Sequence, residues 1–411
     1  MISKTSTGRS AAALGLGVLA LAGGAQMAQA QDAGAALPNC NDATMFPNPI
    51  YLAGSSAFEP AAAKIAVKLS TQATPYNFIY KATASCDGPA NIRDKLTLAG
   101  TGDYFVLDPS DPTNTKAVTK QCSLDAVVTK ADVGVADVSY TSCFSDTLPA
   151  GMAESLGPVQ TMLFVVPKMN TTMTAISAEQ AAAIWGCGAA GAVSPYIDET
   201  AIQQRNATSG TQIMVSKYIG VPAAAFKGVA NATGGALVTS LLAVTDFSKA
   251  IGFYAADGYD TKRATLTSLA FRGFNQDKAY YADSTASATD KKNTRDGHYQ
   301  IFGPLHLFTT GTAPTGVAKK AIDWIQGTSE IVAGKPLSFV DIEAGSGLVP
   351  QCAMKVIRDT DGGFLKPYKP PVSCSCYYEM VVTNSSSGEC VPCMDNSACT
   401  GGKTCQSNFC E

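Results

Sequence analysis

One segment of the sequence places an arginine four residues ahead of a Ser-Gly-Thr turn. Residues 205–211 read Arg-Asn-Ala-Thr-Ser-Gly-Thr, and an amphipathic stretch over residues 212–218, ended by Gly220, predicts a helix directly behind the turn. The N-terminus of a helix presents backbone N–H groups that lack intrahelical partners, and the helix dipole makes this end attractive to anions. The segment is therefore a candidate anion-binding turn.

The side chains of this turn suit a tetrahedral oxyanion. Arg205 offers a bidentate fork, and Ser209 and Thr211 add hydroxyl donors. Gly210 has no Cβ and lets the backbone approach a ligand closely. The alternative is an ordinary capped helix with a surface arginine nearby, because Ser-Gly-Thr ahead of a helix is common capping chemistry.

A second turn of the same kind lies near the start of the chain. Residues 54–60 (Gly-Ser-Ser-Ala-Phe-Glu-Pro) follow a short apolar run and precede a helical pattern. Pro60 suits the first helical turn, because its missing N–H has no helical partner there in any case. Asp137 then ends an alternating apolar strand over residues 133–136. Two hydroxyl-bearing turns and a carboxylate at a strand end favour one oxyanion site over unrelated capping motifs.

The order of these motifs resembles the periplasmic phosphate-binding protein family, the substrate-binding components of phosphate ABC importers. The resemblance spans residues 48–365, and its most specific part is the spacing from arginine to Ser-Gly-Thr. Weaker matches lie at residues 251–254, 299–304 and 318–325. The resemblance implies an α/β fold of the two-lobed periplasmic binding protein kind (type II-like), with two inter-lobe crossings. It also implies a protein that binds phosphate and is not an enzyme.

The resemblance further implies which residues bind phosphate. The first turn maps onto Ser56, Ala57 and Phe58, the second onto Ser85, the carboxylate onto Asp137, and the third turn onto Arg205, Ser209, Gly210 and Thr211. A carboxylate accepts hydrogen bonds but cannot donate them. Asp137 would therefore tolerate hydrogen phosphate, which carries a proton, and repel sulfate, which carries none. The alternative is that Asp137 caps the turn over residues 138–142. No metal and no cofactor is expected.

Three departures from the family pattern bear on the ligand more than on the fold. Ala207 stands where the family carries an aspartate that orients the arginine, so a less rigid guanidinium is expected. The segment between Ser85 and Asp137 is much longer than in the family and contains Cys86 and Cys122. The first turn reads Ser-Ala-Phe where Thr-Phe is usual, which leaves its register open by one residue.

The chain is expected to contain one two-lobed body and an appendage. Residues 48–157 and 300–365 are assigned to the first lobe and residues 158–299 to the second, with crossing strands at 160–166 and 299–304. Ser177 and Gln180 predict a capping box ahead of a helix. The polar stretch 282–296 is interpreted as a loop or surface insertion, and the Pro- and Gly-rich residues 362–373 as a linker.

The N-terminus has the pattern of a secretory signal. Lys4 and Arg9 precede an apolar run, and residues 1–30 are expected to be removed by cleavage after Ala30. The mature chain would then hold 28 Lys and Arg against 33 Asp and Glu, a net charge of −5. No apolar run reaches the ~20 residues of a membrane span. The expected location is periplasmic, or secreted and at the cell surface.

Thirteen cysteines in a chain with an export signal predict disulfides. Seven of them lie in residues 374–411, which are expected to form a small disulfide-rich module. Zinc is the competing explanation for Cys390 and Cys393, although the tail contains no histidine. The odd total leaves one thiol unpaired within the chain, and the connectivity stays open.

Catalytic interpretations have little support in the sequence. His298 and His306 are the only histidines and are interpreted as ordinary surface or strand residues, and no nucleophile elbow, phosphate loop or zinc-protease motif occurs. The leading hypothesis is a monomeric phosphate-binding protein that serves an inner-membrane ABC permease and does not bind nucleic acid. The alternatives are a secreted or surface protein with this fold, altered or lost ligand binding and a tail used for attachment, and a secreted phosphate-ester hydrolase.

Overall fold

The computed structural model describes residues 36–111, 116–124, 129–328 and 338–411 of the chain. The largest sheet has the strand order β10-β6-β13-β5-β1-β2-β3-β4, and β11 also pairs with β6. Its strands are β1 (Pro49–Ser55), β2 (Asn77–Thr83), β3 (Thr101–Leu107), β4 (Ala117–Ser123), β5 (Val133–Ala136), β6 (Met152–Pro167), β10 (Gly252–Ala255), β11 (Leu266–Ser268) and β13 (Phe302–Thr310). β1 pairs in parallel with β2 and β5, whereas β13 runs antiparallel to β5 and β6.

Eleven helices and several short strand pairs complete the fold in the described residues. The helices are α1 (Glu59–Ser70), α2 (Asp87–Arg93), α3 (Tyr140–Cys143), α4 (Ala178–Cys187), α5 (Gly210–Ile219), α6 (Gly234–Ala243), α7 (Ala256–Asp260), α8 (Lys292–Arg295), α9 (Gly316–Ile325), α10 (Ser338–Gly345) and α11 (Ser375–Thr383). The short pairs are β7 (Ala175–Ser177) with β12 (Ala270–Arg272), β8 (Gln203–Arg205) with β9 (Val229–Asn231), β14 (Val356–Ile357) with β15 (Lys366–Pro367), and β16 (Cys405–Gln406) with β17 (Phe409–Cys410).

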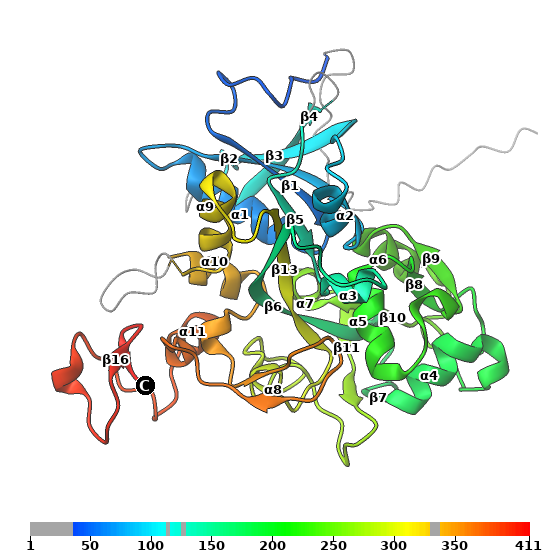
Figure 1. The fold of residues 1–411 in the computed structure, drawn as a ribbon. Coiled ribbons are helices and arrows are strands. Elements are labelled where there is room, and N and C mark those ends of the chain that lie inside the picture. Colours follow the sequence, from blue (N-terminus) through cyan, green and yellow to red (C-terminus); the bar gives the residue numbers. More distant parts are fainter. Residues whose placement is uncertain (1–35, 112–115, 125–128, 329–337) are drawn as a thin grey trace, which may run out of the picture. The chain divides into compact units, whose positions relative to one another are not determined.

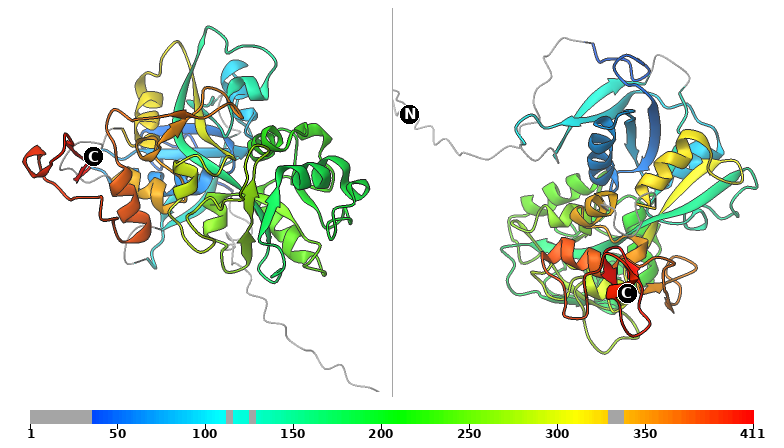
Figure 2. Two further views of the ribbon diagram at one scale, coloured as in Figure 1. Left: turned by 90° about the horizontal axis from the view of Figure 1, so that it is seen from below. Right: turned by 90° about the vertical axis from the view of Figure 1, so that its left-hand side faces the viewer.

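Two separate hydrophobic cores define two lobes. The first lobe packs β1, β2 and β5 with α1 and α9, and the second packs the end of β6 with β10, α4, α5 and α6. β6 is long because it serves both lobes: its first part pairs with β13 and its last residues pair with β10 and β11. Figure 1 shows β6 and β13 running side by side between the two groups of elements, and Figure 2 shows the green helices of the second lobe gathered as a group of their own. The predicted α/β two-lobed fold class is confirmed.

The strand that returns from the second lobe begins later than the sequence suggested. The prediction placed it at residues 299–304, whereas β13 begins at Phe302 and continues to Thr310. Tyr299 packs in the core of the second lobe, and Leu305 packs in the core of the first. The chain therefore crosses between the lobes around the start of β13. The residue bounds assigned to each lobe stay a prediction.

Local helix signals in the sequence correspond to the structure. The Ser177 side chain accepts from the Gln180 amide and the Gln180 side chain accepts from the Ser177 amide, so the capping box is confirmed. Gly220 ends α5 with a φ of 69°, a left-handed conformation that glycine adopts without strain. The stretch 282–296 begins as the loop that the sequence suggested and ends in α8, and its Lys291 is fully buried against Asp260 and Asp283.

The long segment between Ser85 and Asp137 extends the sheet of the first lobe. Its strands β3 and β4 form an antiparallel pair at the edge of that sheet, beside β2. A disulfide joins Cys40 to Cys122 in β4, and another joins Cys86 at the start of α2 to Cys143 in α3. The insertion is thus a covalently tied edge of the first lobe.

The C-terminal residues form the disulfide-rich module that the sequence predicted. The disulfides join Cys352 to Cys374, Cys376 to Cys390, Cys393 to Cys405, and Cys399 to Cys410. Cys390 and Cys393, the pair for which zinc was an alternative, are each used in a different disulfide. Cys187 is the free cysteine, and its side chain is exposed. Figure 2 shows the module, in red, beside the body of the protein.

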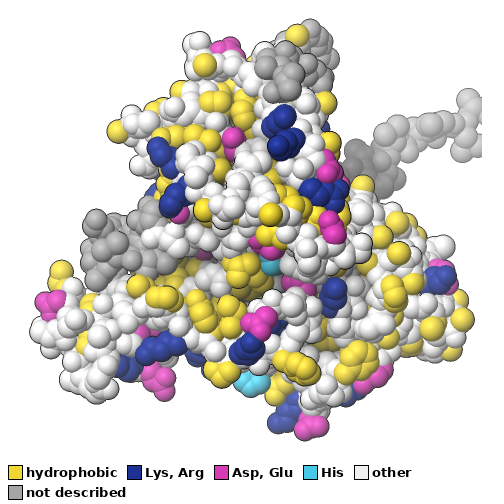
Figure 3. Space-filling view, viewed as in Figure 1, with side chains coloured by type: hydrophobic (Ala, Val, Ile, Leu, Met, Phe, Trp, Pro, Cys, Tyr) yellow, Lys and Arg dark blue, Asp and Glu magenta, His cyan; other side chains and the backbone are white. Residues whose placement is uncertain are grey.

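The proposed export signal, residues 1–30, lies outside the described residues. Among the helices that the structure describes, none has both the length and the apolar character needed to cross a membrane. On the face drawn in Figure 3, Lys and Arg side chains are dispersed among Asp and Glu side chains rather than gathered into one patch.

Candidate anion-binding site

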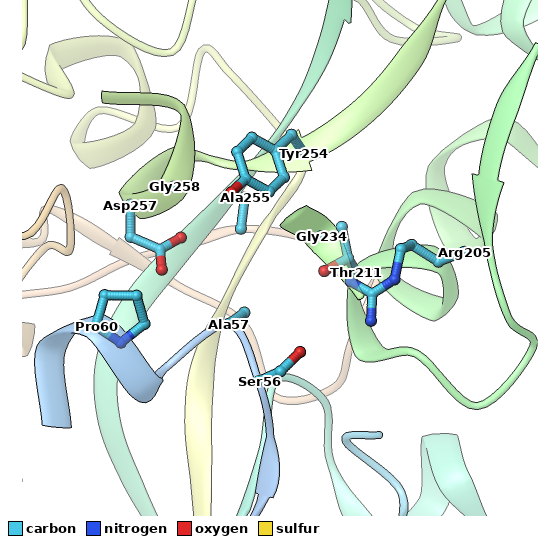
Figure 4. A pocket seen from close by; sticks show the side chains of 10 residues that line it. All are labelled: Ser56, Ala57, Pro60, Arg205, Thr211, Gly234, Tyr254, Ala255, Asp257 and Gly258. Carbon is cyan, nitrogen blue, oxygen red and sulfur yellow. The ribbon is translucent and has the colours of Figure 1, made fainter. Parts of the chain in front are cut away.

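A small cavity of about 50 Å³ lies between the two lobes. Its walls come from the turn between β1 and α1, from the starts of α5 and α6, and from β10 and α7. The lining residues are Ser56, Ala57, Pro60, Arg205, Thr211, Gly234, Tyr254, Ala255, Asp257 and Gly258. Figure 4 shows the Ser56 hydroxyl, the Arg205 guanidinium and the Asp257 carboxyl group directed toward the space between the elements. A cavity of this size has room for a small polyatomic ion or a few waters.

The N-termini of three helices converge on this cavity. Pro60 lies in the first turn of α1, Thr211 in the first turn of α5, and Gly234 is the first residue of α6. These helices have ten to twelve residues each. Each carries a partial positive charge at this end and presents first-turn amides without intrahelical partners. Their convergence makes the cavity favourable for an anion.

Arg205 supplies the full positive charge of the site. The residue ends β8 and is buried, and its backbone amide donates to the Gln212 side chain at 2.8 Å. Its Nε donates to the carbonyl of Asn231 at 3.3 Å and its Nη2 to the carbonyl of Ala232 at 3.0 Å. Burial lowers the pKa of Arg205, and the charge of Asp137 opposes this shift. An arginine stays protonated in any case.

The two carbonyls replace the aspartate that the family carries at position 207. They hold one edge of the guanidinium, and they leave Nη1 on the side of Gly234, which lines the cavity. Ala207 itself is exposed. The sequence did not indicate these two backbone acceptors, and they argue against the loosely held guanidinium that was expected.

Asp137 lies behind the cavity in a network of serine hydroxyls. Its Oδ1 accepts from the Ser55 hydroxyl at 2.5 Å, and its Oδ2 accepts from the Ser85 hydroxyl at 2.8 Å. The Ser85 oxygen in turn accepts from the backbone amide of Gly210 at 3.0 Å. Burial raises the pKa of Asp137, while the two serine hydroxyls and the charge of Arg205 oppose the rise. Each carboxylate oxygen thus accepts a hydrogen bond from within the protein.

The turn after Asp137 is held by a different carboxylate. Asp361 Oδ2 accepts from the backbone amide and the hydroxyl of Ser139, each at 2.8 Å, and from the hydroxyl of Ser142 at 2.7 Å. These are the residues at the start of α3, where the alternative interpretation of Asp137 would have placed a cap. The distant Asp361 performs that function, and Asp137 is turned toward Ser55 and Ser85.

The structure places the nine predicted binding residues at different depths around the site. Ser56, Ala57, Arg205 and Thr211 line the cavity. Ser85, Asp137 and Gly210 form the hydrogen-bonded chain behind it. Ser209 is the buried N-cap of α5. Phe58 is the N-cap of α1, and its ring is fully buried in the first core. Phosphate contacts of these residues stay a prediction.

Sequence reasoning missed Asp257 and the start of α6. Asp257 is 4 % exposed, lies in the short helix α7 and lines the cavity. Gly234 packs so close to Tyr254 that a Cβ at this position would lie 2.6 Å from the ring. Asp257 follows the apolar run Ile251–Ala256 by one residue, so a strand end with a carboxylate was a usable signal, as it was for Asp137.

His306 is a strand residue, as the sequence suggested, but its burial and its two carboxylate neighbours were not expected. It lies in β13 but is buried, and its Nδ1 is 2.6 Å from the Glu154 carboxylate, while its Nε2 is 3.7 Å from Asp361. Burial lowers the pKa of His306, but its interactions with the nearby carboxylates of Asp361 and Glu154 outweigh this and raise the pKa to about 9. The imidazole is therefore a cation at neutral pH, near Asp137. His298 is exposed.

Comparison with known proteins finds similarity to solved structures only. No protein-family model matches the chain, and no curated protein matches it either. An ABC-type phosphate transport receptor from Vibrio cholerae shares 15 % identity and a TM-score of 0.45, over 73 % of this chain and 99 % of the receptor. A protein from Clostridium perfringens, assigned as a phosphate ABC transporter substrate-binding protein with bound phosphate, shares 12 % identity and a TM-score of 0.49, over 74 % and 99 %. A phosphate-binding protein from Stenotrophomonas maltophilia shares 13 % identity and a TM-score of 0.45, over 74 % and 90 %.

These three proteins are named as phosphate-binding or phosphate-transport proteins, and this chain is similar to them in fold. Identities of 12–15 % and TM-scores below 0.5 assign no ligand to this chain. The ligand must be inferred from the cavity and its side chains.

Proposed function

We propose that this chain is an extracytoplasmic solute-binding protein that captures inorganic phosphate between its two lobes. The observation that carries the proposal is the convergence of three helix N-termini and the Arg205 guanidinium on one small cavity. An anion placed there would exchange its hydration shell for fixed dipoles, hydroxyl donors and one buried cation. Capture needs no chemical step, so a binding protein accounts for these residues better than an enzyme does.

The cavity also has a route to solvent. A wider groove shares Ser56 and Gly234 with the cavity and is lined by polar residues, including Glu59, Asn206 and Thr208. An anion would enter through this groove and be enclosed as the lobes close, as in hinged two-lobed binding proteins. We infer that the protein acts as a monomer and delivers the captured anion to an inner-membrane ABC permease.

An extracytoplasmic location is supported by the cysteines. Twelve of the thirteen are paired in six disulfides, and such bonds persist in oxidising compartments. We place the protein in the periplasm, or outside the cell, on this basis.

Calorimetric titration of the purified protein with phosphate tests the proposal. We expect saturable binding by the parent and at least a hundredfold loss in Arg205→Ala, which would leave the anion unmatched by a cation in a buried site. Arg272→Ala is the matched control, because Arg272 pairs with Glu179 at the partly exposed surface of the same lobe. A parent protein that binds no phosphate at millimolar concentration, or an Arg205→Ala variant that binds like the parent, would refute the proposed function.

A further inference from the structure

The cavity contains a carboxyl group that the phosphate-binding pattern does not explain. Asp257 is buried, and its Oδ1 has no hydrogen-bond partner among the described residues. Figure 4 shows its side chain directed into the cavity, across from Ser56 and Arg205. A buried polar oxygen without a partner is costly in a folded protein. A ligand in the cavity would supply the missing partner.

Asp137 is less suited to contact that ligand. Both of its oxygens accept serine hydroxyls, at 2.5 and 2.8 Å, and it is not among the residues that line the cavity. The Ser85 hydroxyl also accepts from Gly210, so this network holds Asp137 behind the cavity wall. Asp257 lines the cavity itself, and one of its oxygens has no partner among the described residues.

We propose that Asp257, rather than Asp137, is the carboxyl group that contacts the bound oxyanion and decides which oxyanions the cavity accepts. This inference rests on the proposed function, since it assigns specificity within the same anion site. It makes Asp257 a specificity-determining residue of this chain.

The surroundings of Asp257 favour its neutral form at neutral pH. Burial raises the pKa of Asp257 to about 8, and the charges of Asp137 and Asp260 add to the rise, although backbone amides oppose it. Lys64 of α1 also interacts with this carboxyl group, as does Tyr254 of β10. Between pH 6 and pH 9 the ionised fraction would increase from about 1 % to about 90 % for a pKa near 8.

The two protonation states recognise different anions. A neutral carboxyl group donates its O–H, so it can bind any oxyanion, including sulfate. An ionised carboxylate only accepts, so it can bind hydrogen phosphate through the proton that this anion carries, and it repels sulfate. Discrimination against sulfate should therefore increase as the pH rises through the pKa of Asp257.

Sulfate is the cleanest probe, because it stays a dianion over the whole range. We would measure its dissociation constant by calorimetry at pH 6 and pH 9 for the parent and for Asp257→Asn, with phosphate as the second ligand. In the parent the affinity for sulfate should fall on the order of tenfold, about the effect of one hydrogen bond to a charged group, while phosphate still binds at pH 9. In Asp257→Asn, which cannot ionise, the affinity for sulfate should fall much less, and the smaller fall that remains comes from His306, whose pKa is about 9. Asp257→Ser is the second variant in case the first does not fold.

Two further variants separate Asp257 from other groups. Burial and Asp103 raise the pKa of Glu59, at the groove, to about 7, so Glu59→Gln must still show the fall in sulfate affinity. The fall in sulfate affinity must also appear in Asp137→Asn. A fall in sulfate affinity that is as large in Asp257→Asn as in the parent, or that disappears in Glu59→Gln or in Asp137→Asn, would overturn the assignment. A parent that binds neither anion would refute the proposed function itself, which is a different outcome.

Discussion

The backbone amide of Gly210 donates a 3.0 Å hydrogen bond to the hydroxyl of Ser85. Ser85 follows β2 in the first lobe, and Gly210 begins α5 in the second, so this bond joins the lobes directly behind the cavity. A Cβ at position 210 would lie 2.5 Å from that hydroxyl oxygen, which only glycine avoids. The α5 N-terminus therefore serves two purposes: its first amide holds the lobes together, and the next residue lines the cavity.

Ser85→Ala should destabilise the protein by about 1–3 kcal/mol, because it leaves the Gly210 amide and one Asp137 oxygen buried without their partner. Urea denaturation of the ligand-free protein measures this. Ser216→Ala is the control, since the Ser216 hydroxyl donates to the Ile213 carbonyl within the same helix; its effect should stay within about 0.5 kcal/mol. Equal stabilities of Ser85→Ala and the parent would mean that the bond between the lobes does not form in solution.

Ala207→Asp should leave phosphate affinity within about twofold of the parent, since a few tenths of a kcal/mol change an equilibrium constant by no more than this. A less rigid guanidinium, as expected from the sequence, would bind more tightly once an added aspartate ordered it. The carbonyls of Asn231 and Ala232 already hold the guanidinium, so little freedom is left to remove. Calorimetric titration with phosphate measures the effect, and a tenfold gain would show that the guanidinium is loose in solution.

The elements at the site could be predicted from the sequence because their signals are local. The Ser-Gly-Thr turn, the helix behind it and Gly220 at its end are encoded in consecutive residues, and α5 follows them closely. The same is true of the capping box at Ser177. The two lobes were implied by the family resemblance that the order of such motifs indicates.

The partners of the site residues could not be predicted, because they depend on contacts between distant segments. Asp361 accepts from Ser139, although the two residues are 222 positions apart in the sequence. Arg205 donates to backbone carbonyls, and the residue types that carry these carbonyls do not indicate such a role. Asp257 has the residue type of a ligand-binding group, but only the fold shows that it faces the same cavity as Arg205.

Titration with a thiol reagent in denaturant should find one free thiol per molecule, that of Cys187. Cys187→Ser should reduce this value to zero and leave the thermal midpoint unchanged, because the side chain is exposed. Finding three or more thiols in the oxidised parent would mean that at least one of the six disulfides does not form.

The His306 cation should stabilise the fold below neutral pH and lose this effect in mild alkali. Its pKa is raised from 6.5 to about 9 by Asp361 and Glu154, against the opposing effect of burial. The contribution is therefore complete below pH 6.5 and disappears as the pH rises to about 9, with a limit of about 3 kcal/mol. Urea denaturation between pH 6 and pH 9 measures the fall, which should be smaller in His306→Gln.

Asp257 should make the opposite kind of contribution, a cost that increases with pH. Burial raises its pKa from 3.8 to about 8, so between these values the unfolded chain ionises while the folded protein keeps the proton. The free energy of unfolding must then fall as the pH rises. Asp257→Asn removes the titration, so its stability relative to the parent should grow by about 2 kcal/mol from pH 4 to pH 6, and further toward pH 8.

Comparing Asp257→Asn with the parent separates the effect of Asp257 from that of His306. The His306 contribution to stability changes only above pH 6.5 and is the same in both proteins. Denaturation curves of Asp257→Asn and the parent at pH 4, 5 and 6 are the measurement. A constant difference over that range would mean that Asp257 ionises normally in the folded protein. A growing difference would show that the chain keeps an acid which lowers its stability at neutral pH, and such a cost is typical of residues retained for binding.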